Sequence, residues 1–211
     1  MTINHKNLAS IKDCLKSYPN TNLLIVTKNQ TQDDILELIE QGNKYFGENR
    51  IQEAKKKYSY LIENKNIKLH LIGPLQSNKT KIALKLFDTI QSIDRKSIVD
   101  QISKIIDKKE KIKTHEYFIQ VNIGNEEQKS GVRIENIDEL YKYSLDKKLN
   151  IKGLMCLPPN VDDPSKFFYE MKKIRDSLDK SLLLSMGMSS DYRHALKYNS
   201  DIIRVGSAIF K

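Results

Sequence analysis

The sequence predicts an α/β fold, a single (β/α)8 barrel spanning residues 1–211, and three observations point to it. Eight short apolar runs follow one another along the chain, and amphipathic stretches of helical period lie between them. No long Gly-, Ser- or Pro-rich linker interrupts the alternation, so one domain is expected. Strands that alternate with helices build a parallel sheet, and eight of them can close into a barrel. A doubly wound open sheet is the alternative, but no G-x-G-x-x-G segment follows the first apolar run.

The apolar runs define the predicted strands. Short, continuous apolar runs are typical of strands whose two faces are both buried. The strands are expected to begin near Asn22, Lys44, Lys68, Thr89, Glu116, Ile151, Leu182 and Asp201. An opening helix, packed against the outside of the barrel, is predicted from the helical spacing of Leu8, Ile11, Cys14 and Leu15.

The stretches between the predicted strands carry helix signals. The segment TQDDILELIEQG has a capping box at Thr31 and Asp34, and Gly42 marks its end. The segment SNKTKIALKLF is expected to begin at a Ser77 cap, and DPSKFFYEMKKIRDSLDK has Pro164 at an allowed first-turn position. The segments DRKSIVDQISKII and RIENIDELYKYSLDKK repeat their apolar residues at the period of a helix.

Composition narrows the classes of protein to consider. The chain is 39% hydrophobic and 30% charged, which is typical of a globular protein. No apolar stretch approaches the ~18 residues of a membrane span, and the opening MTINHKNLAS has no signal-peptide core, so a cytoplasmic protein is expected. Cys14 and Cys156 lie far apart without a CxxC motif, which fits a reducing compartment. The histidines show no metal-ligand spacing, so no metal site is predicted.

The net charge of +9 raises the question of a nucleic-acid partner. Only six of the 36 basic residues are arginine, and the lysines are scattered along the chain. There is no dense arginine cluster and no RNP-type aromatic motif. A partner of this class is therefore not expected.

Small and polar residues gather where the predicted strands end, which is the functional face of a barrel. The loops after the seventh and eighth strands often bind phosphate, and here they carry Ser185, Gly187, Gly206 and Ser207. Glycine lets backbone N–H groups approach an anion, serine adds a hydroxyl donor, and a helix starting near Ser189 would direct its positive end there. The alternative is that these residues form ordinary caps and turns.

Lys28 follows the apolar run of the first strand. At a barrel mouth its amine is expected to be partly desolvated, which favours the neutral, nucleophilic form. An amine beside a phosphate site suggests a Schiff base with pyridoxal 5'-phosphate, a phosphorylated aldehyde. Arg204, on the inward face of the eighth strand, could then face the pyridine nitrogen without giving up its own proton. Position alone favours the alternative, in which Lys28 is a strand-end lysine that extends into solvent.

These segments together resemble the pyridoxal-phosphate homeostasis protein family, nearly from end to end. The resemblance rests on LLIVTK, FGENRIQEAKKK, LHLIGPLQSNK, IQSIDR, FIQVNIGNEEQKSGV, IKGLMCLPP, LSMGMSSDYRHAL and IIRVGSAIF. Two departures are mild. Leu69 stands where the family often has an aromatic residue, and Ser207 stands where it often has threonine, which keeps a hydroxyl donor.

The resemblance implies a barrel similar to the N-terminal domain of alanine racemase, with Lys28 bound covalently to pyridoxal phosphate. It implies further cofactor contacts, with Ser185, Gly206 and Ser207 at the phosphate, Met186 and Gly187 shaping that loop, Arg204 at the ring nitrogen and Asn49 beside the ring. His70 is placed on the third strand, where it could approach the cofactor or serve as a buried structural histidine.

Two functions are weighed on this basis. The first is a non-catalytic carrier that buffers pyridoxal phosphate and delivers it to apoenzymes, expected as a monomer. The second is an amino-acid racemase, which needs an acid/base group on each face of the substrate. In alanine racemase one of these groups is a tyrosine that an additional domain helps to position. Because the sequence ends at Lys211, soon after Arg204, no such domain is expected. The carrier is therefore preferred.

Overall fold

The computed structural model describes residues 2–210, and their eight parallel strands close into a barrel in chain order. Residues 1 and 211, the ends of the predicted domain, lie outside the described residues. The strands are β1 Asn22–Val26, β2 Tyr45–Glu48, β3 Lys68–Leu71, β4 Thr89–Ile93, β5 Glu116–Val121, β6 Ile151–Cys156, β7 Leu183–Ser185 and β8 Ile202–Val205. All eight predicted strands are confirmed, with starts that differ by at most one residue.

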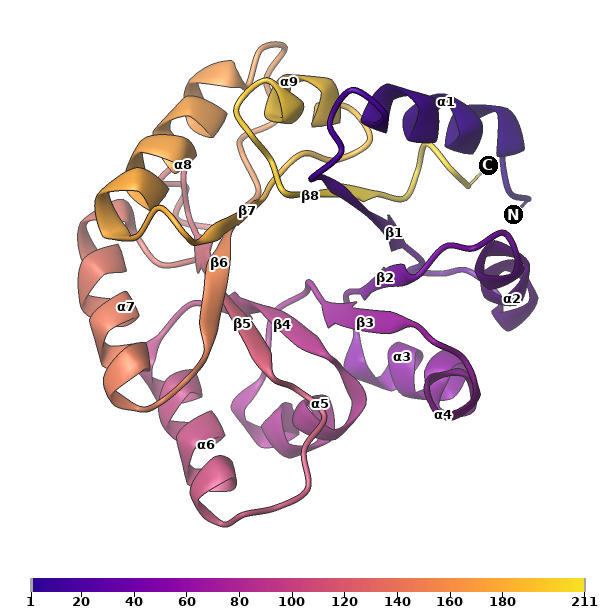
Figure 1. Ribbon diagram of the computed structural model, residues 1–211. Coiled ribbons are helices and arrows are strands. Elements are labelled where there is room, and N and C mark those ends of the chain that lie inside the picture. The colour runs from indigo at the N-terminus through magenta and orange to yellow at the C-terminus, as the bar shows by residue number, and fades with distance from the viewer. Residues whose placement is uncertain (1, 211) are drawn as a thin grey trace.

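Helices surround the barrel on the outside (Figure 1). They are α1 His5–Leu15, α2 Gln32–Glu40, α3 Ile51–Tyr58, α4 Leu61–Asn64, α5 Thr80–Leu86, α6 Lys96–Asp107, α7 Ile137–Asp146, α8 Ser165–Leu178 and α9 Tyr192–Leu196, with 3-10 turns η1 Ser77–Lys79 and η2 Ile134–Asn136. Within residues 2–210, none of these helices has the length and apolar character needed to cross a membrane.

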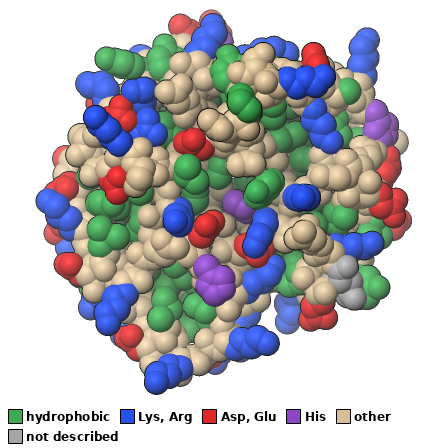
Figure 2. Space-filling model, viewed as in Figure 1, with side chains coloured by type: hydrophobic (Ala, Val, Ile, Leu, Met, Phe, Trp, Pro, Cys, Tyr) green, Lys and Arg blue, Asp and Glu red, His purple; other side chains and the backbone are tan. Residues whose placement is uncertain are grey.

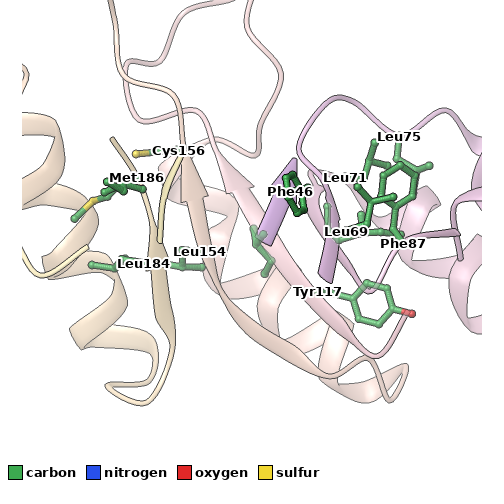
Figure 3. Close-up of a cluster of buried hydrophobic side chains, with 14 of the residues drawn as sticks. Phe46, Leu69, Leu71, Leu75, Phe87, Tyr117, Leu154, Cys156, Leu184 and Met186 are labelled. Carbon is green, nitrogen blue, oxygen red and sulfur yellow. The ribbon is translucent and has the colours of Figure 1, made fainter. Parts of the chain in front are cut away.

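The strands bury both faces, and the two faces belong to different clusters. The larger cluster fills the layer between sheet and helices, and it includes Phe46, Leu69, Phe87 and Leu184 (Figure 3). A smaller cluster of Leu24, Phe118, Met155 and Ile202 fills the barrel interior. Since side chains alternate along a strand, β1, β5, β6 and β8 each supply both clusters, which explains their continuous apolar runs.

The predicted start of α2 is confirmed in detail. Thr31 Oγ1 accepts a hydrogen bond from Asp34 N at 3.2 Å, and Asp34 Oδ2 accepts one from Thr31 N at 3.0 Å, which together form the capping box. Gly42 follows the helix with φ of +80°, as expected at a helix end.

Two expectations about helices are wrong. The Ser77 hydroxyl caps no helix, because Ser77 lies inside the 3-10 turn η1 and α5 begins only at Thr80. Helices α3 and α4, between β2 and β3, were not predicted. The basic run Lys55–Lys57 obscures the periodicity of α3, although Ala54 and Tyr58 are buried on its inner face.

The opening helix α1 packs against the outside of the barrel as predicted, with Leu8 and Ile11 buried. Both ends of the described chain meet here, as Figure 1 shows. Asn4 N donates a hydrogen bond to Ile209 O at 2.7 Å, and Asn7 Nδ2 donates one to Ala208 O at 2.9 Å. The helix therefore holds the segment that follows β8.

Basic side chains are spread over the face seen in Figure 2, and acidic side chains lie between them. Many of the lysines form ion pairs with nearby carboxylates, such as Lys81 with Glu110 and Lys96 with Glu139. On this face the charge of +9 is therefore not gathered into one patch.

Candidate functional site

A pocket of about 590 Å³ lies at the barrel mouth, beside the ends of β1 and β8. Its lining comprises Val26, Lys28, Asn49, Ile72, Leu157, Met188, Ser189, Ser190, Arg204, Gly206, Ser207 and Ala208. The volume is in the range of small-molecule sites, ~300–1,000 Å³. Five of the nine predicted cofactor residues line this pocket: Lys28, Asn49, Arg204, Gly206 and Ser207.

Lys28 reaches the pocket because side chains alternate along β1. Leu24 lies in the barrel interior and Val26 lines the pocket, so Lys28 continues the same face just past the strand end. The side chain is exposed, and the expected partial burial of its amine is not found. The orientation of Lys28 therefore comes from the backbone on either side of it.

A buried lysine fixes the backbone before Lys28. Lys57, on α3, is 8% exposed, and its Nζ donates a hydrogen bond to Thr27 O at 2.6 Å. The same Nζ lies 2.5 Å from Glu48 Oε1 and 2.8 Å from Glu53 Oε1. We call Glu48, Glu53 and Lys57 the buried charge cluster.

The buried charge cluster also fixes the backbone after Lys28. Asn29 N donates a hydrogen bond to Glu53 Oε1, and Asn29 has φ of +62°, which turns the chain away from the strand. Glu48 is fully buried, and Thr27 Oγ1 donates to its Oε1 at 2.7 Å. Burial raises the pKa of Glu48, and Lys57 opposes that shift. These contacts were not predicted, because a lysine in a basic run is ordinarily exposed.

Arg204 points from β8 into the barrel and is only 3% exposed. Its Nη1 donates hydrogen bonds to Ser185 O at 2.6 Å and Ser185 Oγ at 2.9 Å, and its Nη2 donates to Cys156 O at 2.7 Å. Burial lowers the pKa of the guanidinium, and no carboxylate forms an ion pair with it in residues 2–210. Its Nε–H has no acceptor in the described part of the chain, so this donor is available to a ligand.

Ser185, predicted at the phosphate, does not line the pocket. Its side chain is fully buried in the barrel interior, and its hydroxyl is bonded to Gln91 and Arg204. Ser185 lies too deep in the barrel to reach the mouth. It pairs with Met155 and Ile202 inside the sheet and does not lie beyond a strand end.

Met186 and Gly187 support the site from behind rather than line it. Met186 belongs to the layer between sheet and helices, near Cys156 and Leu184 (Figure 3). Gly187 has φ of +95°, and a Cβ on it would lie 2.7 Å from the Cβ of Ala195. Only glycine fits this turn, which lets the chain pass from β7 to α9.

Two backbone N–H groups after β8 converge on one oxygen. Gly206 N and Ala208 N both donate to Ser189 Oγ, at 3.3 Å and 3.2 Å. A Cβ on Gly206 would lie only 3.0 Å from Val26 O, so glycine gives this segment its close approach to β1. Ser207 lies between the two donors and lines the pocket. This pair of N–H groups, with the hydroxyls of Ser189 and Ser207, is an oxygen-binding cradle.

Sequence reasoning missed Ser189 and Ser190 as lining residues. Both lie in the loop between β7 and α9, and α9 begins at Tyr192 rather than near Ser189 as expected. The run SMGMSS offered a signal, since it places two further serines beyond the strand end.

Asn49, predicted beside the cofactor ring, is half-buried at the end of β2 and lines the pocket. A Cβ on Gly73 would lie 2.1 Å from Asn49 O, so the loop after β3 presses against Asn49 only because residue 73 is glycine. His70 lies deeper, inside the barrel. Its Nδ1 lies 2.9 Å from Gln91 Nε2, and burial lowers its pKa to about 4. His70 is therefore neutral and does not line the pocket.

Comparison with known proteins identifies the family of this chain. The alanine racemase N-terminal domain family matches residues 4–211. The pyridoxal phosphate homeostasis protein of Aquifex aeolicus is 36% identical over 197 residues, which cover 89% of this chain and 85% of that protein.

Solved structures of PipY from Synechococcus elongatus are similar over nearly their whole length. The structure without PLP has a TM-score of 0.87 at 30% identity, and the structure with PLP bound has 0.84 at 29% identity. Each comparison covers 98% of this chain and 99% of the PipY chain.

Proposed function

Since the chain belongs to the pyridoxal phosphate homeostasis proteins, within the alanine racemase N-terminal domain family, we propose that it holds pyridoxal 5'-phosphate as a Schiff base on Lys28. In this proposal the protein buffers the cofactor inside the cell and delivers it to apoenzymes. One observation carries the proposal. The pocket at the barrel mouth brings the Lys28 amine, the oxygen-binding cradle and the unpaired Nε–H of Arg204 to one cavity.

These residues fit the chemistry of pyridoxal phosphate. The N–H groups of Gly206 and Ala208 already share one oxygen acceptor, and a phosphate oxygen is an acceptor of the same kind. Ser189 and Ser207 add hydroxyl donors. Arg204 can only donate, so it suits an unprotonated ring nitrogen. When bound, pyridoxal phosphate would supply an aldehyde carbon that bonds reversibly to an amine.

The exposure of Lys28 supports exchange rather than permanent storage. Water and competing amines can reach an amine that lies at an open mouth, and release of the aldehyde needs only such an attack. A second cavity of about 570 Å³ adjoins the first and shares Leu157, Met188 and Ser190 with it. We expect the protein to act in the cytoplasm as a monomer.

The lining of the pocket favours a carrier over a racemase. Among the described residues that line it, Lys28 and Arg204 are the ionisable ones, and neither tyrosine nor carboxylate is present. Arg204 cannot act as a base. A two-base racemisation therefore finds one acid/base group in the lining of this pocket, and the second would have to come from the adjoining cavity, whose lining includes Lys129, Asp162 and Asp191.

Borohydride mapping tests the proposal. Borohydride reduces a Schiff base to a stable secondary amine, so treatment of the purified protein with bound cofactor should leave one labelled peptide, the one that contains Lys28. Lys28→Ala should lose this label, whereas Lys79→Ala, at a neighbouring cavity, should keep it. A wild-type label at any other lysine would refute the assignment.

The racemase alternative has its own assay. L-Alanine and other L-amino acids incubated with the holoprotein should keep their optical rotation. Sustained loss of rotation that depends on Lys28 would make the protein an enzyme and overturn the carrier proposal.

A further inference from the structure

The barrel interior contains a continuous chain of buried polar groups below the pocket. Arg204 Nη1 lies 2.9 Å from Ser185 Oγ, Ser185 Oγ lies 2.6 Å from Gln91 Oε1, and Gln91 Nε2 lies 2.9 Å from His70 Nδ1. All four residues are at most 5% exposed. They come from β8, β7, β4 and β3, so the chain spans the barrel from one side to the other.

With the Gln91 amide oriented as in the structure, the donors and acceptors of this chain run in one direction. Arginine has no acceptor, so Ser185 Oγ must accept from Arg204 and donate its own hydrogen to Gln91 Oε1. That bond fixes the amide of Gln91, whose Nε2 must then donate to His70 Nδ1. His70 Nδ1 is therefore unprotonated, and the ring proton lies on Nε2.

We propose that His70, Gln91 and Ser185 are a positioning relay that fixes the guanidinium of Arg204 in the pocket. Both hydrogens of Nη1 are directed to Ser185, and one hydrogen of Nη2 is directed to Cys156 O. The donors left for a ligand are Nε–H and the second Nη2–H. This inference rests on the proposed function only in the identity of the ligand that these donors meet.

The surroundings of the relay argue that it does more than fill space. Four other interior positions are apolar, namely Leu24, Phe118, Met155 and Ile202, so packing alone does not require a glutamine at position 91. Tyr45 packs edge-on against the His70 ring, and the charges that His70 senses, Asp88 and Lys68, are opposite in sign. Burial has the largest effect on the pKa of His70 and lowers it. The ring is therefore neutral near neutral pH, and Nδ1 is free to accept a hydrogen bond.

A first experiment examines the relay in protein without cofactor. The ¹⁵N NMR spectrum should show His70 as the Nε2–H tautomer, and the Arg204 Nε–H should give one sharp signal. Gln91→Met removes both bonds of the amide at similar volume, and it should broaden that signal and expose Arg204 Nε–H to faster solvent exchange. An Nδ1–H tautomer in the wild type would overturn the relay.

Gln120→Met is the matched control. Gln120 is a buried glutamine on the adjacent strand β5, but its Nε2 donates to Ser130 O at 3.1 Å and takes no part in the relay. In the holoprotein, Gln91→Met should raise the dissociation constant of pyridoxal phosphate ~10-fold and shift its visible absorption band. The reason is that a guanidinium no longer held by the relay should lose its hydrogen bond to the ligand, and a hydrogen bond from a charged group is worth about this much. Gln120→Met should change neither. Equal effects of the two variants, or no effect of Gln91→Met, would refute the proposal.

A second pair of variants decides the matter if Gln91→Met does not fold. His70→Asn keeps an acceptor oxygen near the place of Nδ1, and His70→Leu removes it. The relay requires that His70→Asn retain the wild-type band and affinity and that His70→Leu lose both. Equal behaviour of these two variants would contradict it. If wild-type protein binds no pyridoxal phosphate, the proposed function fails, and the NMR measurement still judges the relay.

Discussion

Lys28 shares its exposure with most lysines of the chain, so exposure does not distinguish it. Its surroundings do. Lys57 holds the carbonyl of Thr27 before it, and Glu53 holds the N–H of Asn29 after it. A fixed backbone limits the positions that the exposed amine can reach, and this orientation is what a site for a covalent ligand needs.

Removal of Lys57 should therefore damage both stability and orientation. Lys57→Met leaves the fully buried Glu48 without its counter-charge, and breaking such a pair costs about 3–5 kcal/mol. The free energy of unfolding from urea titration measures the loss. The double variant Lys57→Met/Glu48→Gln should recover most of it, because a neutral amide needs no counter-charge. An equally unstable double variant would show that packing of the lysine stem matters more than its charge.

The stability that Lys57→Met loses relative to wild type should depend on pH. Burial already raises the pKa of Glu48, and the loss of Lys57 should raise it further. A carboxyl whose folded-state pKa is raised contributes stability at low pH and loses it as pH rises through that pKa. The deficit of Lys57→Met against wild type should thus be smaller near pH 5 than near pH 7. A deficit that is constant across this range would mean that Glu48 does not titrate there.

His70 should make the wild-type protein sensitive to mild acid. Burial lowers its folded-state pKa from 6.5 to about 4, so the unfolded chain takes up a proton that the folded protein excludes. The stability that this represents is present above pH 6.5 and is lost as pH falls towards 4, by about 3 kcal/mol in total. Urea titrations of wild type and His70→Asn should converge or cross as the pH falls.

At the scale of elements, the capping box of α2 offers a simple test. Thr31→Ala removes the oxygen that accepts from Asp34 N, and the expected cost is ~1 kcal/mol. Ser77→Ala is the control, because Ser77 was expected to be a cap and its hydroxyl caps nothing in the structure. Its effect on the free energy of unfolding should stay within about 0.5 kcal/mol. A loss at Ser77 as large as that at Thr31 would contradict this account of the two helix starts.

The elements that sequence predicted well are those whose signal is local. The strands are buried on both faces, so their apolar runs stand out, and Thr31 and Asp34 form a cap within four residues of chain. Helix α3 was missed because one of its buried residues is Lys57, whose partner Glu48 lies on another element. Burial of a lysine depends on a partner that periodicity along the chain does not reveal.

The site was predicted only in part, because some of its residues are placed by local alternation along a strand and others by contacts between distant segments. Alternation along β1 and β8 places Lys28 and Arg204 toward the interior, and both line the pocket. Ser185 also points inward, but at a level where it meets Gln91 rather than the mouth. Ser189 was missed because it lies in a loop whose path no periodicity predicts, and only the folded chain brings it to Gly206 N.

At the scale of the whole molecule, the pocket depends on closure of the barrel. Strand β1 pairs with β8, with Leu24 beside Arg204, so a lysine from the start of the chain and a cradle from its end share one wall. Helix α1 packs over the segment after β8 and adds a contact close to the cradle, between Asn7 Nδ2 and Ala208 O. The first helix therefore takes part in shaping a site to which it contributes no lining residue.

This arrangement predicts different outcomes for two neighbouring asparagines. Asn4 Oδ1 caps α1 by accepting from Asn7 N at 3.0 Å, whereas the Asn7 amide holds the carbonyl of Ala208, the residue whose N–H belongs to the cradle. Asn4→Ala and Asn7→Ala should each lower the free energy of unfolding by ~1 kcal/mol. Only Asn7→Ala should also lower the affinity for pyridoxal phosphate, by ~5-fold, because it frees the backbone that presents the N–H groups. Calorimetric titration of both variants measures this, and equal affinities would mean that α1 stabilises the barrel without shaping the site.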